Sequence, residues 1–350
     1  MPRAAPRILV LADCGPEVGG GHVMRCLALT QALIAKGVSC AFMATPQVAR
    51  VLDAFALAGL ERQPVPEAPL HQLIEAAARA AEAWGATAVL VDHYGFGARQ
   101  EQLLRGGGRR LLCIDDLAQR PHDCDLLIDP TLGRDAQAYQ GLTPAGCKVL
   151  AGPGYALLRP EYAKARDAVL ARRRPADVPQ RVLISLGLMD FRGITGRVMN
   201  LIGPALGEFD VDIAIGSEAT SLSWLRRLEG QNARMTLHPD ASDMAELIGH
   251  ADIGVGAGGA STWERATLGL ASISLILAAN QEAVALELDR QGGSIAVDAR
   301  GSDFAQTLPA AFERLKTEAD LRARLSHISA GLCDGRGAER AAEAIAALLI

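Results

Sequence analysis

Two patterns of apolar and polar residues alternate along the chain. Short, almost wholly apolar runs are typical of strands buried in a parallel sheet, and longer stretches with an apolar residue every third or fourth position are typical of helices. In the first half, runs of the first kind lie at 7–12, 38–44, 88–94, 109–116, 125–132 and 148–158. The helical pattern is found in the face formed by Val23, Leu27, Thr30 and Ile34, and at 46–58, 70–84 and 97–105.

The same alternation restarts after a polar helical stretch at 160–174 and a linker with two prolines at 172–180. Strand-like runs follow at 181–187, 210–216, 234–239, 251–259, 272–278 and 294–299, and helical stretches at 303–316, 318–330 and 336–349 end the chain. Strands alternating with helices predict an α/β protein whose parallel sheets are covered on both faces. We therefore predict two doubly wound, Rossmann-like domains, 1–174 and 175–350, which face each other across a ligand-binding cleft.

Composition narrows the possible classes of function. The 350 residues are 49% apolar and 21% charged, which suits a globular chain with a sizeable core. The formal net charge of −5 argues against a nucleic-acid partner. No apolar run approaches the roughly 20 residues of a membrane span, and the N-terminal segment lacks a signal-peptide pattern. We expect a cytoplasmic monomer without stable membrane insertion.

Neither cysteine nor histidine spacing indicates a metal site. The seven cysteines include no CxxC pair, so the sequence predicts reduced thiols rather than disulfides or a zinc knuckle. No HExxH-type spacing occurs. We expect neither a metal nor an organic cofactor.

The first candidate for chemistry is a glycine-rich turn between the first strand and its helix. Gly19, Gly20 and Gly21 allow the backbone to adopt positive φ and to approach a ligand closely. His22 falls in the first helical turn, where the positive end of the helix dipole disfavours an imidazolium and leaves a usable general base. The alternative is an ordinary glycine turn with a solvated histidine.

A second glycine turn follows the predicted strand at 251–259. Backbone N–H groups at Gly258 and Gly259, with the hydroxyls of Ser261 and Thr262, are suited to phosphate, and Glu264 to ribose hydroxyls. The alternative is a helix cap formed by one of the two hydroxyls. Because no lysine follows as in a P-loop, a P-loop NTPase is disfavoured.

Further polar groups stand at predicted strand ends. Tyr94 ends the segment DHY at 92–94, and its alternative role is that of a simple turn residue. The adjacent carboxylates at 115–116 point to opposite faces, so at least one is expected to be structural. Asn280 and Gln281 open a helix, and their amides suit sugar hydroxyls or an acetamido group; the alternative for Asn280 is a helix cap.

Taken in order, these segments resemble a known family, the UDP-sugar hydrolases of pseudaminic acid biosynthesis, which act in flagellin glycosylation. The resemblance is carried by long motifs spread over almost the whole chain: GGGHVMRCLALTQAL (19–33), VDHYG (91–95), IDDLAQRPHDCDLLID (114–129), LAGPGYALLRPEY (150–162), GAGGASTWERATLGL (256–270) and NQE (280–282). The family is similar to the peptidoglycan N-acetylglucosaminyltransferases of MurG type, which implies a GT-B architecture.

The resemblance also implies a reaction and a set of site residues. The expected reaction is metal-independent hydrolysis of UDP-2,4-diacetamido-2,4,6-trideoxy-β-L-altropyranose to UDP and the free sugar. The implied catalytic residues are His22, Tyr94 and Asn280. The expected contacts to UDP and substrate are Gly19, Gly20, Gly21, Gly187, Gly258, Gly259, Ser261, Thr262, Glu264 and Gln281.

The sequence departs from the family at one turn. Members carry GG-[ST]-D after the first strand of the second domain, whereas this chain has Gly187-Leu188-Met189-Asp190. Leucine does not take positive φ cheaply, and methionine has no hydroxyl. Two alternatives to a hydrolase therefore stay open: a UDP-sugar glycosyltransferase of the same fold, which uses an acceptor hydroxyl in place of water, and a non-catalytic nucleotide-sugar-binding protein.

Overall fold

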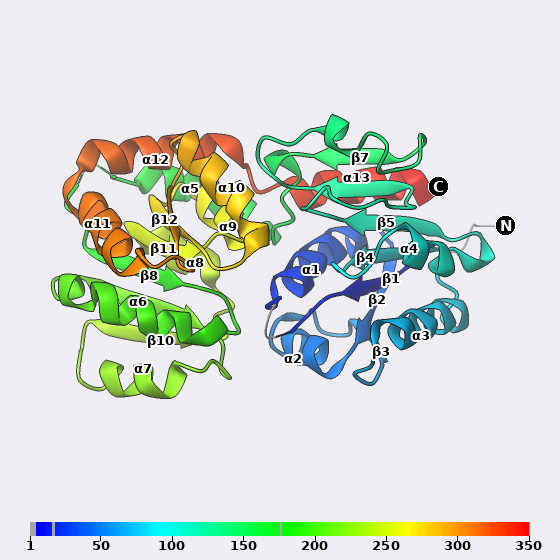
Figure 1. Ribbon diagram of the computed structural model, residues 1–350, viewed down its shortest axis with the longest axis horizontal. Helices are drawn as coiled ribbons and strands as arrows, with labels where there is room; N and C mark the ends of the chain where they lie inside the picture. Colours follow the sequence, from blue (N-terminus) through cyan, green and yellow to red (C-terminus); the bar gives the residue numbers. More distant parts are fainter. Residues whose placement is uncertain (1–4, 16–17, 176, 350) are drawn as a thin grey trace. The chain divides into compact units, whose positions relative to one another are not determined.

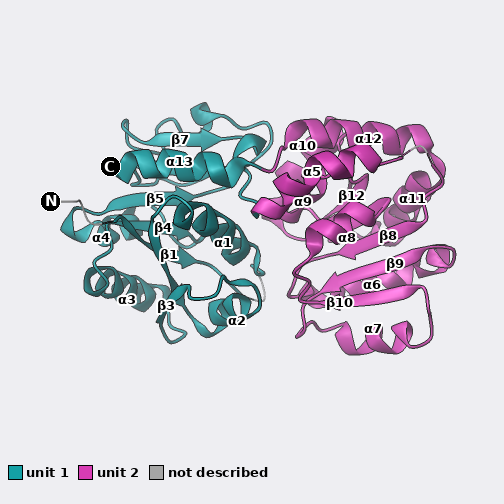
Figure 2. Cartoon of the chain, turned by 180° about the vertical axis from the view of Figure 1, so that it is seen from behind, with its two compact units in different colours: residues 1–159, 336–350 teal, residues 160–335 magenta. Residues whose placement is uncertain are grey.

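Each of two units of the chain is built around one parallel sheet. The computed structural model describes residues 5–15, 18–175 and 177–349. Unit 1 comprises residues 1–159 and 336–350, and unit 2 comprises residues 160–335 (Figure 2). The prediction of doubly wound α/β units is confirmed by the strand orders given below.

Unit 1 contains a seven-stranded sheet with the order β3-β2-β1-β4-β5-β6-β7 (Figure 1). Its strands are β1 (Arg7–Ala12), β2 (Ser39–Ala44), β3 (Glu61–Pro64), β4 (Ala88–Asp92), β5 (Arg110–Ile114), β6 (Leu126–Asp129) and β7 (Lys148–Ala151). Its α-helices are α1 (Gly21–Ile34), α2 (Pro46–Phe55), α3 (Leu70–Ala83), α4 (Ala98–Leu104) and α13 (Gly337–Leu349). Leu9 and Leu11 of β1 face the core that α3 and α4 cover.

Unit 2 contains a six-stranded sheet with the order β10-β9-β8-β11-β12-β13. Its strands are β8 (Arg181–Ser185), β9 (Asp210–Ile215), β10 (Met235–Pro239), β11 (Ile253–Ala257), β12 (Ser272–Ile276) and β13 (Ile295–Asp298). Its α-helices are α5 (Pro160–Arg172), α6 (Ile194–Ile202), α7 (Leu222–Glu229), α8 (Met244–His250), α9 (Ser261–Thr267), α10 (Ala279–Arg290), α11 (Phe304–Thr317) and α12 (Ala319–Leu332). Phe312 of α11 is completely buried in the main core.

The edge strand β3 was not predicted from the sequence. It pairs with β2 through Ala44↔Pro64 and neighbouring positions, but its sequence ERQP contains no apolar run. Only one side of an edge strand needs a partner, so its side chains are largely solvated and a polar sequence is tolerated. Tertiary pairing, rather than local preference, forms this strand.

The structure divides the chain differently from the boundary expected near residue 175. Helix α5 belongs to unit 2, where Arg166 donates hydrogen bonds to the carbonyls of Ala330 (2.6 Å) and Cys333 (3.1 Å). Helix α13 belongs to unit 1, where it lies against α1 (Figure 1). Helix α5 begins the continuous stretch of unit 2, whereas α13 returns to unit 1, because its packing partner α1 lies far away along the chain.

A membrane-crossing helix is absent from the described parts of the chain, since none there combines the necessary length and apolar character.

Candidate functional site

The first group of candidate residues lies where the strand order of unit 1 reverses. Strands β1 and β4 are neighbours at that point, and chain connections leave them in opposite directions. In open α/β sheets, ligands bind at the carboxyl ends of the strands beside such a switch point. The glycine turn at 19–21 and the DHY segment at 92–94 both follow strands at this edge.

His22 lies in the first turn of α1, as predicted, and its ring orientation is fixed by Asp92. The imidazole is buried, and its Nδ1 lies 3.2 Å from both the backbone oxygen and Oδ1 of Asp92. Because Nδ1 faces two acceptors, it carries the ring proton. With the proton on Nδ1, Nε2 carries the lone pair of the neutral ring. The predicted catalytic pair is also brought together: the Tyr94 ring meets His22 edge-on, with centroids 4.7 Å apart.

Arg25 ties the His22 surroundings into a buried charge cluster. Its Nε and Nη2 donate a bidentate pair of hydrogen bonds to Asp92, both 2.6 Å long. Its Nη1 donates to Asp116 Oδ2 at 2.8 Å, and the Tyr94 hydroxyl donates to Asp116 Oδ1 at 2.9 Å. Burial would lower the pKa of Arg25, but the charges of Asp92 and Asp116 raise it well above its ordinary value. Likewise burial raises the pKa of Asp116, and Arg25 outweighs this and lowers it.

Sequence reasoning missed Arg25 as a site residue and left Asp92 and Asp116 without a role. An arginine three positions after His22, within an otherwise apolar helical stretch, was the available signal. The two adjacent carboxylates do point apart, as predicted. Asp115 is completely buried and pairs with Arg120 at 2.7 Å, whereas Asp116 faces the site.

A backbone hydrogen bond closes the glycine turn before His22. Gly19 has φ +78°, and its N–H donates to the Gly15 carbonyl at 2.7 Å. A side chain at Gly21 would meet no atom within 4 Å, so open space adjoins the start of α1. The structure therefore requires glycine for backbone conformation at Gly19, whereas a Cβ at Gly21 would contact nothing.

Unit 2 repeats this arrangement at its own switch point, between β8 and β11. Gly187 follows β8 with φ +100°, and the second glycine turn follows β11. Cβ atoms added to Gly258 and Gly259 would each lie 3.5 Å from the Gln281 side chain. Gln281 Oε1 in turn accepts a hydrogen bond from the Leu277 N–H at 3.0 Å. Three of the predicted nucleotide-side residues are thus brought into contact, and Asn280 lies beside them at the start of α10.

The hydroxyls of this turn do not cap helix α9. The Thr262 hydroxyl is buried and donates to the Ala257 carbonyl at 3.2 Å, and the helix has no side-chain cap. Beneath the turn, Arg265 donates to Ala257 O at 2.9 Å and to Ser261 Oγ at 3.1 Å. Burial lowers the pKa of Arg265 to about 10. The Thr262 hydroxyl therefore stabilises the turn through its hydrogen bond to Ala257. Glu264 lies in the first turn of the helix.

The turn that departs from the family pattern is formed without strain at Leu188. Positive φ falls on Gly187 and on Asp190 (φ +45°). The buried Asp190 carboxylate accepts hydrogen bonds from the N–H groups of Thr195 and Ser221, both at 2.8 Å. The aspartate thus holds the turn in place, and the leucine avoids the left-handed region.

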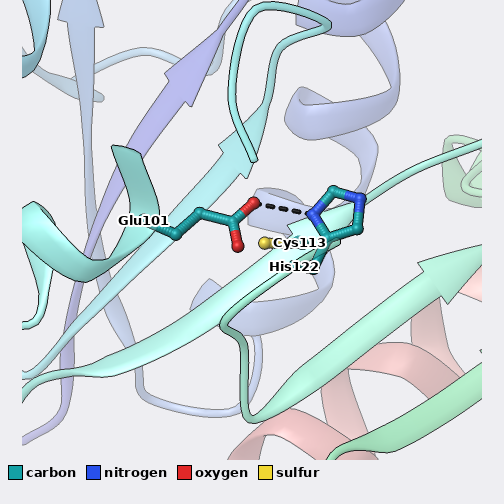
Figure 3. A group of neighbouring side chains, drawn as sticks. All are labelled: Glu101, Cys113 and His122. Carbon is teal, nitrogen blue, oxygen red and sulfur yellow. Dashed lines mark hydrogen bonds and ion pairs between the residues drawn. The ribbon is translucent and has the colours of Figure 1, made fainter. Parts of the chain in front are cut away.

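A separate cluster, also in unit 1, contains three residues of types that commonly bind metal ions: Glu101, Cys113 and His122 (Figure 3). Glu101 Oε1 and His122 Nδ1 are only 2.7 Å apart, whereas two ligands of one tetrahedral zinc stand about 3.3 Å apart. Burial lowers the pKa of His122, but the nearby carboxylates of Asp115 and Glu101, the latter hydrogen-bonded to Nδ1, outweigh it and raise the pKa to about 9. The contact is therefore an ion pair between a carboxylate and an imidazolium.

Comparison with known proteins finds two relatives in sequence and a set of solved structures with the same fold. No family model matches it. It is 24% identical over 243 residues to UDP-2,4-diacetamido-2,4,6-trideoxy-beta-L-altropyranose hydrolase of Campylobacter jejuni, covering 69% of this chain and 81% of the relative. It is 23% identical over 192 residues to the spore coat polysaccharide biosynthesis protein SpsG of Bacillus subtilis, covering 54% and 56%.

Among solved structures, MurG of Acinetobacter baumannii matches with a TM-score of 0.65 and 17% identity, over 98% of this chain and 99% of that one. The spinosyn rhamnosyltransferase SpnG, solved with thymidine diphosphate, matches with a TM-score of 0.64 and 17% identity, over 98% and 99%. The resemblance to the altropyranose hydrolase that the motifs indicate is thus confirmed by sequence similarity, and the chain has the GT-B fold of the MurG-type glycosyltransferases.

Proposed function

We propose that this protein is a UDP-sugar hydrolase that releases UDP and the free sugar from UDP-2,4-diacetamido-2,4,6-trideoxy-β-L-altropyranose, a step of pseudaminic acid biosynthesis. The observation that carries the proposal is the state of His22. Its Nδ1 is held by Asp92 at the switch point of unit 1, so that Nε2 carries the lone pair of the neutral ring. Similarity to the altropyranose hydrolase of Campylobacter jejuni supports the choice of substrate.

In the proposed reaction, His22 Nε2 removes a proton from water as the water oxygen attacks the anomeric carbon. A positioned general base contributes typically 10²- to 10⁴-fold to the rate. The bond from the anomeric carbon to the UDP oxygen breaks in the same displacement, so the configuration inverts. Tyr94 and Asn280 orient the water or the acetamido groups of the sugar.

In this proposal, residues of unit 2 bind the UDP group of the substrate. UDP is a good leaving group, so its departure needs stabilisation of negative charge rather than a strong proton donor. Backbone N–H groups at Gly258 and Gly259, together with Ser261, are assigned to the diphosphate, and Glu264 to the ribose. Gly187 and Gln281 complete the contacts. The packing of Gln281 against both glycines supports a preformed turn.

The proposal is tested by incubating the protein with the UDP-diacetamido-trideoxy-altropyranose, without acceptor and with EDTA present, and following both products by NMR. We expect stoichiometric release of UDP and free sugar, with inversion in the first sugar anomer seen. His22→Ala should lower kcat by at least about 10²-fold. The matched control is His71→Ala, because His71 is an exposed histidine on α3 and should keep full activity.

Retention of configuration, or rapid turnover by His22→Ala, would refute this mechanism. UDP release that becomes fast only when an alcohol acceptor is added would instead favour a glycosyltransferase, the activity named for several proteins of the same fold. Tight binding of the substrate without any product would favour a non-catalytic binding protein.

A further inference from the structure

His22 contacts a cluster of charged side chains in which negative charges exceed positive charges by one. Asp92 and Asp116 supply two carboxylates, and Arg25 supplies one guanidinium that bonds to both. Asp92 is completely buried, and the side chains of His22 and Arg25 are nearly so. With a neutral imidazole the cluster carries a net charge of −1, and with an imidazolium it is neutral.

Other groups facing His22 do not cancel this excess. Tyr94 contributes a hydroxyl group that donates a hydrogen bond to Asp116. Burial lowers the pKa of the neighbouring His93, and Asp13, 3.6 Å from its Nδ1, opposes that shift. Arg120 bonds to Asp115 rather than to the cluster. An imidazolium at His22 is opposed by the Arg25 guanidinium, by the neighbouring His93 and by the N-terminus of α1, which carries a partial charge of roughly +0.5.

We propose that Asp92 and Asp116 are positioning residues for His22. Asp92 holds the ring with its proton on Nδ1, and Asp116 supplies the excess negative charge that stabilises the imidazolium once Nε2 has taken a proton. As a statement about catalysis, this inference rests on the proposed function. As a statement about ring tautomer and charge, it is measurable without turnover.

Charge balance favours a proton on His22, because the charged groups around it are buried. The charge of Asp92 is neutralised by Arg25, which donates a bidentate pair of hydrogen bonds to that carboxylate. Asp116 is then the carboxylate whose charge is left over. A proton arriving on His22 restores neutrality, and the electrostatic coupling between His22 and Asp116 already acts in the other direction to lower the pKa of Asp116.

The test substitutes Asp116→Asn, which removes the charge and keeps the shape. An asparagine amide can accept from Arg25 and donate to the Tyr94 hydroxyl, so the contacts survive. In protein with ¹⁵N-labelled histidine, we expect the NMR titration midpoint of His22 to fall by about one pH unit in the variant. The acidic limb of the kcat/KM profile should move by the same amount. Asp116→Glu, which restores the charge, should return both towards the wild-type values.

The control is Asp135→Asn, which removes one negative charge at an exposed position of unit 1 and should leave the midpoint unchanged. An unchanged midpoint in Asp116→Asn overturns the inference. A second readout needs no variant: the ¹⁵N shifts of neutral His22 should report the Nδ1–H tautomer, and the Nε2–H tautomer would overturn the role given to Asp92. If the wild type releases no UDP while both NMR results hold, the proposed function fails and the charge assignment stands.

Discussion

The buried imidazolium of His122 predicts how the stability of this protein depends on pH. Burial lowers its pKa, but the nearby carboxylates of Asp115 and Glu101 outweigh this effect and raise the pKa from the ordinary 6.5 to about 9. A group whose pKa is raised by folding binds its proton more tightly in the folded state. Its contribution is therefore complete below pH 6.5 and is lost as the pH rises through 9.

The magnitude follows from the size of the shift. One pKa unit corresponds to about 1.4 kcal/mol, so the rise to about 9 is worth about 3 kcal/mol of unfolding free energy. His122 is almost wholly buried, which keeps the interaction from being screened by solvent. A loss of this size is a large part of the stability of an ordinary domain.

The assay compares the wild type with His122→Gln by urea unfolding at pH 6, 7.5, 9 and 10. Glutamine can still donate to Glu101 but has no charge to lose. Other groups that titrate above pH 8 are common to both proteins and cancel in the difference. We expect the wild type to exceed the variant by about 3 kcal/mol at pH 6 and this advantage to shrink towards zero at pH 10. A difference that is constant across this range would refute the reasoning.

Two further predictions concern backbone positions. A Cβ added to Gly337 would lie 2.3 Å from the Ala156 carbonyl oxygen, so Gly337→Ala should lower the unfolding free energy by about 3 kcal/mol. The control is Gly331→Ala in α12, where an added Cβ would meet no atom within 4 Å. This variant should raise the unfolding free energy by about 0.5 kcal/mol. Equal effects of the two substitutions in urea unfolding would contradict the packing argument. The third prediction concerns Asp190, whose two carboxylate oxygens accept one hydrogen bond each from the N–H groups of Thr195 and Ser221. Asp190→Asn keeps only one of these oxygens, so it should lower the melting temperature and reduce the unfolding free energy by about 1–3 kcal/mol. An unchanged melting temperature would show that the aspartate does not hold the turn.

Much of the fold could be predicted because buried parallel strands carry their signal locally. The run around Val89 is apolar on both faces, the run around Ile273 alternates apolar residues with small serines, and both are interior strands in the structure. Strand β3 could not be predicted, because at a polar sheet edge the backbone hydrogen bonds to β2 matter more than side-chain preference. The unit boundary depends on which surface α13 covers, and its own apolar pattern does not specify that surface.

The sequence indicates several residues of the candidate site, but it does not reveal all the contacts that these residues make. Glycine turns at strand ends identify His22 and the Gly258–Gly259 turn, since positive φ and close approach need particular residues. The contact between His22 and Tyr94 could be expected from neighbouring strand ends. By contrast, the hydroxyl of Thr262 is committed to the Ala257 carbonyl, a contact that the sequence pattern of a helix start does not reveal.

By itself, the sequence determined the alternation of strands and helices, the positions of the two glycine turns and the resemblance to UDP-sugar hydrolases. These depend on local periodicity and on short motifs, which are contiguous in the chain. Only the tertiary structure decided the electrostatics of His22. Arg25 lies 67 positions from Asp92 and 91 from Asp116, and folding the parallel sheet makes all three neighbours. Charge balance in a buried site depends on distance in space, and spacing along the chain does not specify it.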